Sequence, residues 1–291
     1  MEIRVLRYFL ETAREGNMTR AAERLHVTQP TLSKQIKELE TELGKKLFIR
    51  GNFNVTLTEE GMILRKRAED LLSIAEKIET EFKNMDSITG GDVYIGCAES
   101  YLIKYLAKAV KKLNEKYENI HYHITSGGTE QVIEKLERGI LDMAFIVEPP
   151  ELSKYNYLDI PEADKWGIYM LRDCPLTQKE YITVDDLLPY PVFCSEQSVK
   201  ADLPRWAGEK AEKLNVIANF NLANNSFVFV REGLGLGLSF EKIIEVNENT
   251  DLTFRPLEPP LYNKMCVIWK KYQMFTPVAE LLLEEIKKVI Q

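Results

Sequence analysis

Residues 19–61 constrain this chain more than any other stretch, because they predict two short helices joined by a tight turn. The apolar side of the first helix is formed, at helical spacing, by Ala21, Ala22 and Leu25. The pattern breaks at His26-Val27, and Thr28 is then a suitable N-cap for a second helix. Pro30 falls in the first turn of that helix, where its missing N–H costs nothing. The apolar side of the second helix continues with Leu32, Ile36 and Leu39.

The polar side of this second helix carries side chains suited to reading a nucleic acid. Gln29 can form a paired hydrogen bond with adenine, while Thr31 and Ser33 can meet base edges or thymine methyl groups. Lys34 and Lys37 lie on the same side and suit phosphate or guanine. The alternative is a polar face that water simply solvates. The helix–turn–helix spacing favours the DNA interpretation.

The N-terminal segment resembles the LysR-type transcriptional regulators. The run RAAERLHVTQPTLSKQIKELE is similar to the helix-turn-helix of that family, and ELGKKLFIR with VTLTEEG resembles its wing and the entry to its linker helix. The resemblance implies that Gln29, Pro30, Ser33 and Lys34 face the major groove and that Arg50 lies at the wing. The predicted DNA-binding residues are Thr28, Gln29, Pro30, Thr31, Ser33, Lys34, Lys37 and Arg50.

One part of the wing departs from the family pattern, which commonly has several basic residues after the position of Arg50. Their places are taken here by Gly51, Asn52, Phe53, Asn54 and Thr56. Each lost phosphate contact weakens binding to DNA. We therefore expect the wing to contribute less, and affinity to depend more on Lys34, Lys37, Lys45, Lys46 and dimerisation.

The distribution of charge separates the N-terminal segment from the rest. The whole chain has 291 residues and a net charge of −7. Residues 1–58 hold 10 basic and 7 acidic residues, a net charge of +3, so the remainder has a net charge of −10. A basic head on an acidic body fits a DNA-reading module joined to a sensor. The length suits two or three domains, and without a membrane-spanning run or signal peptide we expect a cytoplasmic protein.

Residues 59–88 predict a long linker helix that begins after Thr58, with Glu59 and Glu60 in its first turn. Its apolar residues alternate at spacings of four and three: Leu64, Ala68, Leu71, Ala75, Ile78, Phe82 and Met85. Such a stripe must be covered, either by the chain's own body or by a second copy. The regular alternation with charged flanks favours a helix–helix homodimer.

Residues 91–291 predict an α/β effector-binding domain, in which strands alternate with helices and indicate a parallel sheet. Two of the expected strands lie near 155–160 and 166–171, and the last helix is expected at 277–290. The resemblance implies two lobes that close on a ligand, as in periplasmic binding proteins. We place lobe I at about 91–162 and 267–291, and lobe II at about 163–266. With the winged helix-turn-helix at 1–58, the expected fold class is α/β overall.

The ligand of such a domain is expected outside the carboxyl ends of the strands, between the lobes. Four strand-to-helix loops supply candidates: 99–101, 127–129, 195–198 and 224–226. The predicted effector-binding residues are Ser100, Thr129, Ser195, Ser198 and Asn224. Hydroxyls and N–H groups at helix starts favour a carboxylate, although capping alone would also explain these residues. If Glu99 and Glu196 face the cleft, an amine or amino-acid-like metabolite is the alternative.

The sequence gives little support for a redox, metal-binding, dinucleotide-binding or catalytic function. Four scattered cysteines (Cys97, Cys174, Cys194 and Cys266) indicate buried thiols rather than a redox pair, and His121 with His123 lack a third metal ligand. The glycines at 233, 235 and 237 follow a predicted helix, whereas a dinucleotide fingerprint needs them after a strand. No acid, base and nucleophile converge, so an enzyme is the weaker alternative, and no metal or cofactor is expected.

The sequence therefore predicts a DNA-binding transcriptional regulator whose promoter binding is modulated by a small metabolite. Its expected partners are double-stranded DNA carrying an interrupted inverted repeat, the effector, and a second copy of the chain in a dimer or a dimer-built tetramer. RNA polymerase is a further candidate partner, and no membrane is expected to be one. A plain metabolite-binding protein is the remaining alternative, and the N-terminal helix-turn-helix argues against it.

Overall fold

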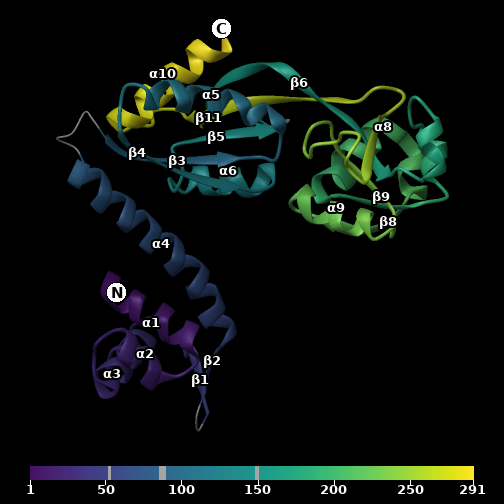
Figure 1. Cartoon of the computed structure of the whole chain (residues 1–291). Helices are drawn as coiled ribbons and strands as arrows, with labels where there is room; N and C mark the ends of the chain where they lie inside the picture. The colour runs from purple at the N-terminus through teal and green to yellow at the C-terminus, as the bar shows by residue number, and fades with distance from the viewer. Residues whose placement is uncertain (52–53, 85–89, 148–150) are drawn as a thin grey trace. The chain divides into compact units, whose positions relative to one another are not determined.

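The computed structural model describes residues 1–51, 54–84, 90–147 and 151–291. The chain divides into two compact units, Met1–Lys83 and Asn84–Gln291, each with its own apolar core (Figure 1). Within the described residues, no helix combines the length and the apolar character needed to cross a membrane.

The first unit is a small helical domain with a two-stranded wing. Its elements are α1 (Ile3–Glu15), α2 (Met18–Arg24), α3 (Gln29–Leu43), β1 (Phe48–Arg50), β2 (Val55–Leu57) and α4 (Glu59–Asn84). The predicted N-cap is confirmed, because the Thr28 side chain accepts a hydrogen bond from the backbone N–H of Thr31. Phe9, Leu32 and Ile36 are fully buried at the centre of the unit and fix α1 against α3.

Helix α4 begins where the sequence predicts, with the Thr58 hydroxyl accepting a hydrogen bond from Gly61 N–H at 2.9 Å. Its predicted apolar stripe is divided between two environments. Near the start of the helix, Ala68 is fully buried in the core of the first unit. Further along, Leu71, Ile78 and Phe82 are exposed, and the predicted stripe member Met85 lies outside the described residues. The core of the first unit therefore covers only the first part of the stripe.

The second unit is built on a nine-stranded sheet in the order β4-β3-β5-β11-β6-β9-β7-β8, with β10 paired to β6. The strands are β3 (Gly90–Cys97), β4 (Asn119–Ser126), β5 (Met143–Val147), β6 (Tyr155–Leu171), β7 (Pro191–Ser195), β8 (Asn215–Phe220), β9 (Leu236–Phe240), β10 (Leu252–Pro256) and β11 (Tyr262–Lys270). The α-helices are α5 (Lys104–Asn114), α6 (Thr129–Glu137), α7 (Val184–Leu187), α8 (Leu203–Ala207), α9 (Ala223–Arg231) and α10 (Pro277–Ile290).

The sheet is mixed, so the expectation of a parallel sheet is wrong for its centre. β3 pairs in parallel with β4 and β5, and β7 pairs in parallel with β8 and β9. β6 and β11 run antiparallel to each other and to their other neighbours. The sequence pattern predicts two strands near 155–160 and 166–171, whereas the structure has one continuous strand, β6. It also places a strand at β10, where none was expected.

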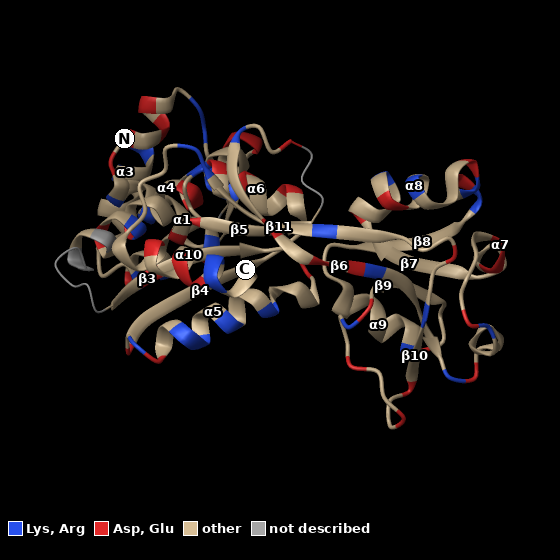
Figure 2. Ribbon diagram, turned by 90° about the horizontal axis from the view of Figure 1, so that it is seen from above, with Lys and Arg blue, Asp and Glu red and all other residues tan. Residues whose placement is uncertain are grey.

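The long strands β6 and β11 join two groups of elements, as Figures 1 and 2 show. One group holds β3, β4, β5 and the helices α5, α6 and α10, and an ion pair of 2.8 Å between Lys116 and Glu285 ties α10 to the end of α5. The other group holds β7, β8, β9 and the helices α8 and α9. The predicted lobe boundaries fall inside β6 and β11, and their residue positions stay a prediction.

Candidate nucleic-acid interface and candidate ligand cavity

Helix α3 presents the polar side chains that the sequence singles out. Most of them are exposed: Thr28, Gln29, Pro30, Thr31, Lys34 and Lys37. The hydroxyls of Thr28 and Thr31 are 2.8 Å apart, which fixes the start of the helix. Lys34 lies 3.8 Å from Glu38 in an exposed ion pair, a weak contact that phosphate can replace. The side of α3 turned away from the core is therefore free to meet a polyanion.

The two other predicted DNA-binding residues contact each other. The guanidinium of Arg50, at the end of β1, donates a hydrogen bond of 3.2 Å to the half-buried hydroxyl of Ser33. It also lies 3.9 Å from the carboxylate of Glu40. The structure thus holds Arg50 against α3, where one side chain of the wing and the polar side of the helix form a continuous surface.

Glu40 holds the contact between α3 and the wing together. Its role was not predicted from the sequence, because a glutamate on a helix is ordinarily solvated. Burial opposes its charge, but hydrogen bonds from the backbone N–H of Leu47 at 2.9 Å and from Lys46 at 3.1 Å outweigh that effect. The pKa of Glu40 is therefore held below its ordinary value. This carboxylate connects α3 to the first strand of the wing.

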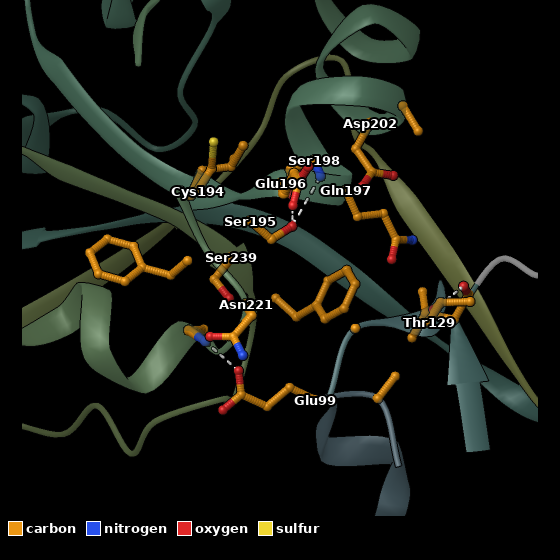
Figure 3. A pocket seen from close by; sticks show the side chains of 18 of the residues that line it. Glu99, Thr129, Cys194, Ser195, Glu196, Gln197, Ser198, Asp202, Asn221 and Ser239 are labelled. Carbon is orange, nitrogen blue, oxygen red and sulfur yellow. Dashed lines mark hydrogen bonds between the residues drawn. The ribbon is translucent and has the colours of Figure 1, made fainter. Parts of the chain in front are cut away.

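The second unit contains a cavity of about 220 Å³ at the carboxyl ends of β3, β7 and β8 (Figure 3). The loop before α6 and the start of α9 complete its wall. This is the position that the parallel-strand rule predicts for a ligand. Apolar side chains of Val147, Trp166, Phe220, Leu238 and Phe240 form much of the lining.

Three of the five predicted effector-binding residues line this cavity. Thr129 is buried and its hydroxyl donates to the carbonyl oxygen of Val147 at 3.0 Å. The hydroxyls of Ser195 and Ser198 are 2.6 Å apart, and Ser195 also accepts from the backbone N–H of Ser198. These hydroxyls therefore have intramolecular partners, although each has capacity for a further hydrogen bond.

The remaining two predicted residues lie outside the cavity lining and connect neighbouring elements. Ser100 is buried, and its hydroxyl donates to the carboxylate of Asp164 on β6 at 2.6 Å. Burial raises the pKa of Asp164 to about 6. The Asn224 side chain, on α9, donates to Glu99 at 3.4 Å. Whether either residue touches an effector stays a prediction.

Two further polar lining residues, Gln197 and Ser226, lie in the candidate loops 195–198 and 224–226 without having been singled out. The polar lining residues outside the four candidate loops include Gln131, Asp202, Asn221 and Ser239. Asn221 directly follows β8, and its position after a strand was a usable signal. Ser239, inside β9, gave no signal, because the sequence pattern does not show which side of a strand faces a cavity.

The thiol and histidine groups show no arrangement for catalysis or metal binding. No cysteine of the described residues forms a disulfide, and burial raises the pKa of both Cys97 and Cys194 to about 12, which makes these thiols poor nucleophiles. His123 lies 2.6 Å from Asp92, outside the cavity. In the part of the chain that the structure describes, no three potential metal ligands gather.

Two family models match nearly the whole chain. Residues 3–62 match the bacterial regulatory helix-turn-helix protein model of the lysR family, and residues 89–291 match the LysR substrate binding domain. Among curated relatives, the Hca operon transcriptional activator HcaR of Escherichia coli (strain K12) is 29% identical over 285 residues, covering 94% of this chain and 93% of HcaR.

An uncharacterized HTH-type transcriptional regulator of Bacillus subtilis (strain 168), YvbU, is 26% identical and covers 99% of both chains. Among solved structures, the LysR family regulator CbnR has a TM-score of 0.76 at 18% identity, covering 100% of both chains. CbnR in complex with its target DNA has a TM-score of 0.75, also at 18% identity, covering 99% of this chain and 100% of that one. The chain therefore belongs to the LysR family, and it is a DNA-binding transcriptional regulator with a substrate-binding domain rather than an enzyme.

Proposed function

We propose that this regulator binds promoter DNA at an interrupted inverted repeat and that a small metabolite in the cavity of the second unit modulates the binding. The exposed polar side of α3 carries the first part of the proposal. Gln29 is free of the core and stands in the first turn of a capped helix, the place from which such helices read base edges. The solved complex of CbnR with its target DNA supports the same use of this fold.

The proposed assembly is a homodimer or a tetramer built from dimers. The exposed Leu71, Ile78 and Phe82 on α4 support it, because they fall on one side of the helix and lie outside the core of the first unit. Pairing of two such helices would remove this apolar surface from water. A dimer would also present two copies of α3, as an inverted repeat requires.

The proposed effector is a carboxylate or an amino-acid-like metabolite. The cavity at the strand ends supports a small ligand, and β6, which contributes Trp166 to its wall, pairs with β9 and β11 of the sheet. A ligand that binds one arrangement of these elements better than another would shift the population toward it, and α4 would convey the change to α3. Contact with RNA polymerase at the promoter belongs to the same proposal.

The test is fluorescence anisotropy of the full chain on DNA from directly upstream of its own coding region. The titration is carried out with excess random duplex and at several salt concentrations. Competitor-resistant binding is the expected result. Weak binding that random duplex abolishes would contradict sequence-specific recognition at this site, and the same titration on genomic fragments would then find any distant target.

A further inference from the structure

Glu99 has an unusual position in the cavity wall. It follows β3 and lines the cavity (Figure 3). Its carboxylate reaches α9 of the other group of elements, where it accepts hydrogen bonds from the backbone N–H of Ala223 and from the Asn224 side chain. Ala223 is the first residue of α9, so Glu99 takes the place at this helix start where the carboxylate of a ligand would otherwise bind. An anionic ligand would have to compete with a carboxylate that the chain itself supplies.

The other charged lining residues add to this preference. The lining contains four carboxylates, from Glu99, Glu130, Glu196 and Asp202, and one basic side chain, Lys200. Lys200 is paired with Glu196 at 2.8 Å. Asp202 accepts a hydrogen bond from the Asn263 side chain at 2.9 Å and lies 3.3 Å from Arg205. An anion entering this space would meet net negative charge.

Glu99 differs from Glu196 and Asp202 because its hydrogen bonds come from neutral donors. Burial raises the pKa of Glu99, and the hydrogen bonds from Ala223 and Asn224 offset only part of that effect. Among the residues that the structure describes, no basic side chain forms a hydrogen bond with this partly desolvated carboxylate. A positive group on a ligand would supply the missing charge and would gain a charge-assisted hydrogen bond.

The rest of the wall suits a compact apolar body. Trp166, Phe220 and Phe240 line the cavity together with Val147 and Leu238. Aromatic faces attract a cation as well as apolar groups, so they do not oppose an ammonium. The volume of about 220 Å³ limits the ligand to a small molecule.

We propose that the cavity binds a small primary amine with an apolar body, its ammonium group against the carboxylate of Glu99. The inference rests on the proposed function, in which this cavity is the effector site, and makes Glu99 its specificity-determining residue. Binding is non-covalent, and the ammonium adds to the hydrogen bonds that Glu99 already makes with α9.

The test uses matched probe molecules and the full chain. The same skeletons, of roughly three to eight carbon atoms to suit a cavity of this size, carry an ammonium, a hydroxyl or a carboxylate. Binding is measured by calorimetry on the wild-type protein, on Glu99→Gln and on Glu118→Gln. Gln keeps an oxygen that can accept from Ala223 but removes the charge. Glu118 is exposed and outside the cavity, so its replacement matches the change in net charge.

The expected result is that an amine binds at least about tenfold more tightly than its matched alcohol and carboxylate, and that Glu99→Gln alone removes this preference. Equal melting temperatures of the three proteins would show that the loss is not caused by unfolding. Selective binding of carboxylates, or amine binding unchanged in Glu99→Gln, would overturn the inference and leave the proposed function standing. Failure of every probe to bind would also overturn the inference, and the anisotropy titration on DNA would then show separately whether the proposed DNA binding stands.

Discussion

Single side chains on α3 are expected to divide the work of DNA recognition. Gln29→Ala should lower discrimination at one or two base pairs by about 1–3 kcal/mol, because an amide can read adenine by two hydrogen bonds. Lys34→Ala should weaken binding to all DNA sequences alike. It should also lower the salt dependence of the binding affinity by roughly the amount of one phosphate contact. Anisotropy titrations on single-base variants of the target DNA, at several salt concentrations, measure both. Equal and uniform losses in the two variants would show that Gln29 does not read bases.

Asp164 gives a pH-dependent prediction. Its pKa in the folded protein is about 6 against an ordinary value of 3.8, mainly because it is buried. The folded state therefore holds the proton more tightly, and the stability from this group is present at low pH and lost as the pH rises through about 6. The Asp164→Asn variant has no charge at this position. Its free energy of unfolding relative to wild type should therefore increase as the pH rises from about 4 to about 7, by at most about 3 kcal/mol.

The measurement is urea unfolding at several pH values, followed by tryptophan fluorescence. The three tryptophans, Trp166, Trp206 and Trp269, all lie in the second unit, so the signal reports the unit that contains Asp164. Asp159→Asn, at an exposed position on the same strand, is the matched control. A stability difference between Asp164→Asn and wild type that is independent of pH would contradict the buried charge as its origin.

Local chemistry explains which residues could be predicted from the sequence. Thr28 and Thr58 cap helices through residues that follow within three positions, so their roles could be inferred from the neighbouring sequence. The hydrogen bond between Ser100 and Asp164 could not be inferred, because the two residues stand 64 positions apart and only the tertiary fold brings them together. The inward-facing role of Glu40 likewise depends on where the wing packs.

At the level of elements, helix boundaries were predicted better than sheet pairing. The last helix, α10, spans the predicted residues 277–290, because Thr276 and Pro277 mark its start. By contrast, β6 was expected as two strands, since the charged residues between its apolar ends indicate a break. β11 pairs with β6 on both sides of the polar stretch, at residues 155–159 and 163–165, with a bulge between them. Antiparallel pairing at the centre of the sheet depends on chain direction, which alternation of strands and helices does not reveal.

Helix α4 carries a prediction about self-association. Ile78 is exposed on the same side of the helix as Leu71 and Phe82, and burying a glutamate at that position would be costly. Ile78→Glu should weaken dimerisation by at least about tenfold without unfolding the first unit, because Ile78 lies outside its core. Sedimentation velocity over a range of protein concentrations measures this.

The matched control is Arg65→Gln, which changes the net charge by the same amount. Arg65 is exposed and is not a member of the stripe, and its ion pair of 3.0 Å with Glu69 contributes little to stability. It should leave self-association unchanged. Equal weakening by both variants would point to net charge, and no weakening by Ile78→Glu would rule out the stripe as the dimer contact.

For the whole molecule, the separation into two units predicts that binding of DNA and of ligand can be divided physically. The core of residues 1–83 includes Ala68 of α4, and the cavity is lined entirely by residues of the second unit. Residues 1–84 should therefore fold alone and bind target DNA with the salt dependence of the full chain, because the phosphate contacts are the same. Residues 90–291 should bind the amine probes within roughly threefold of the full chain, since the two sites share no residues.

What the fragments should lose is the response of one site to the other. Ligand should change the DNA affinity of the full chain and leave that of residues 1–84 untouched, because coupling requires both sites in one molecule. By the same linkage, target DNA should change the ligand affinity of the full chain by the same factor and leave residues 90–291 unaffected. Paired anisotropy and calorimetry measure the two factors. Unequal factors in the full chain would mean that a further equilibrium, such as dimerisation through α4, changes along with binding.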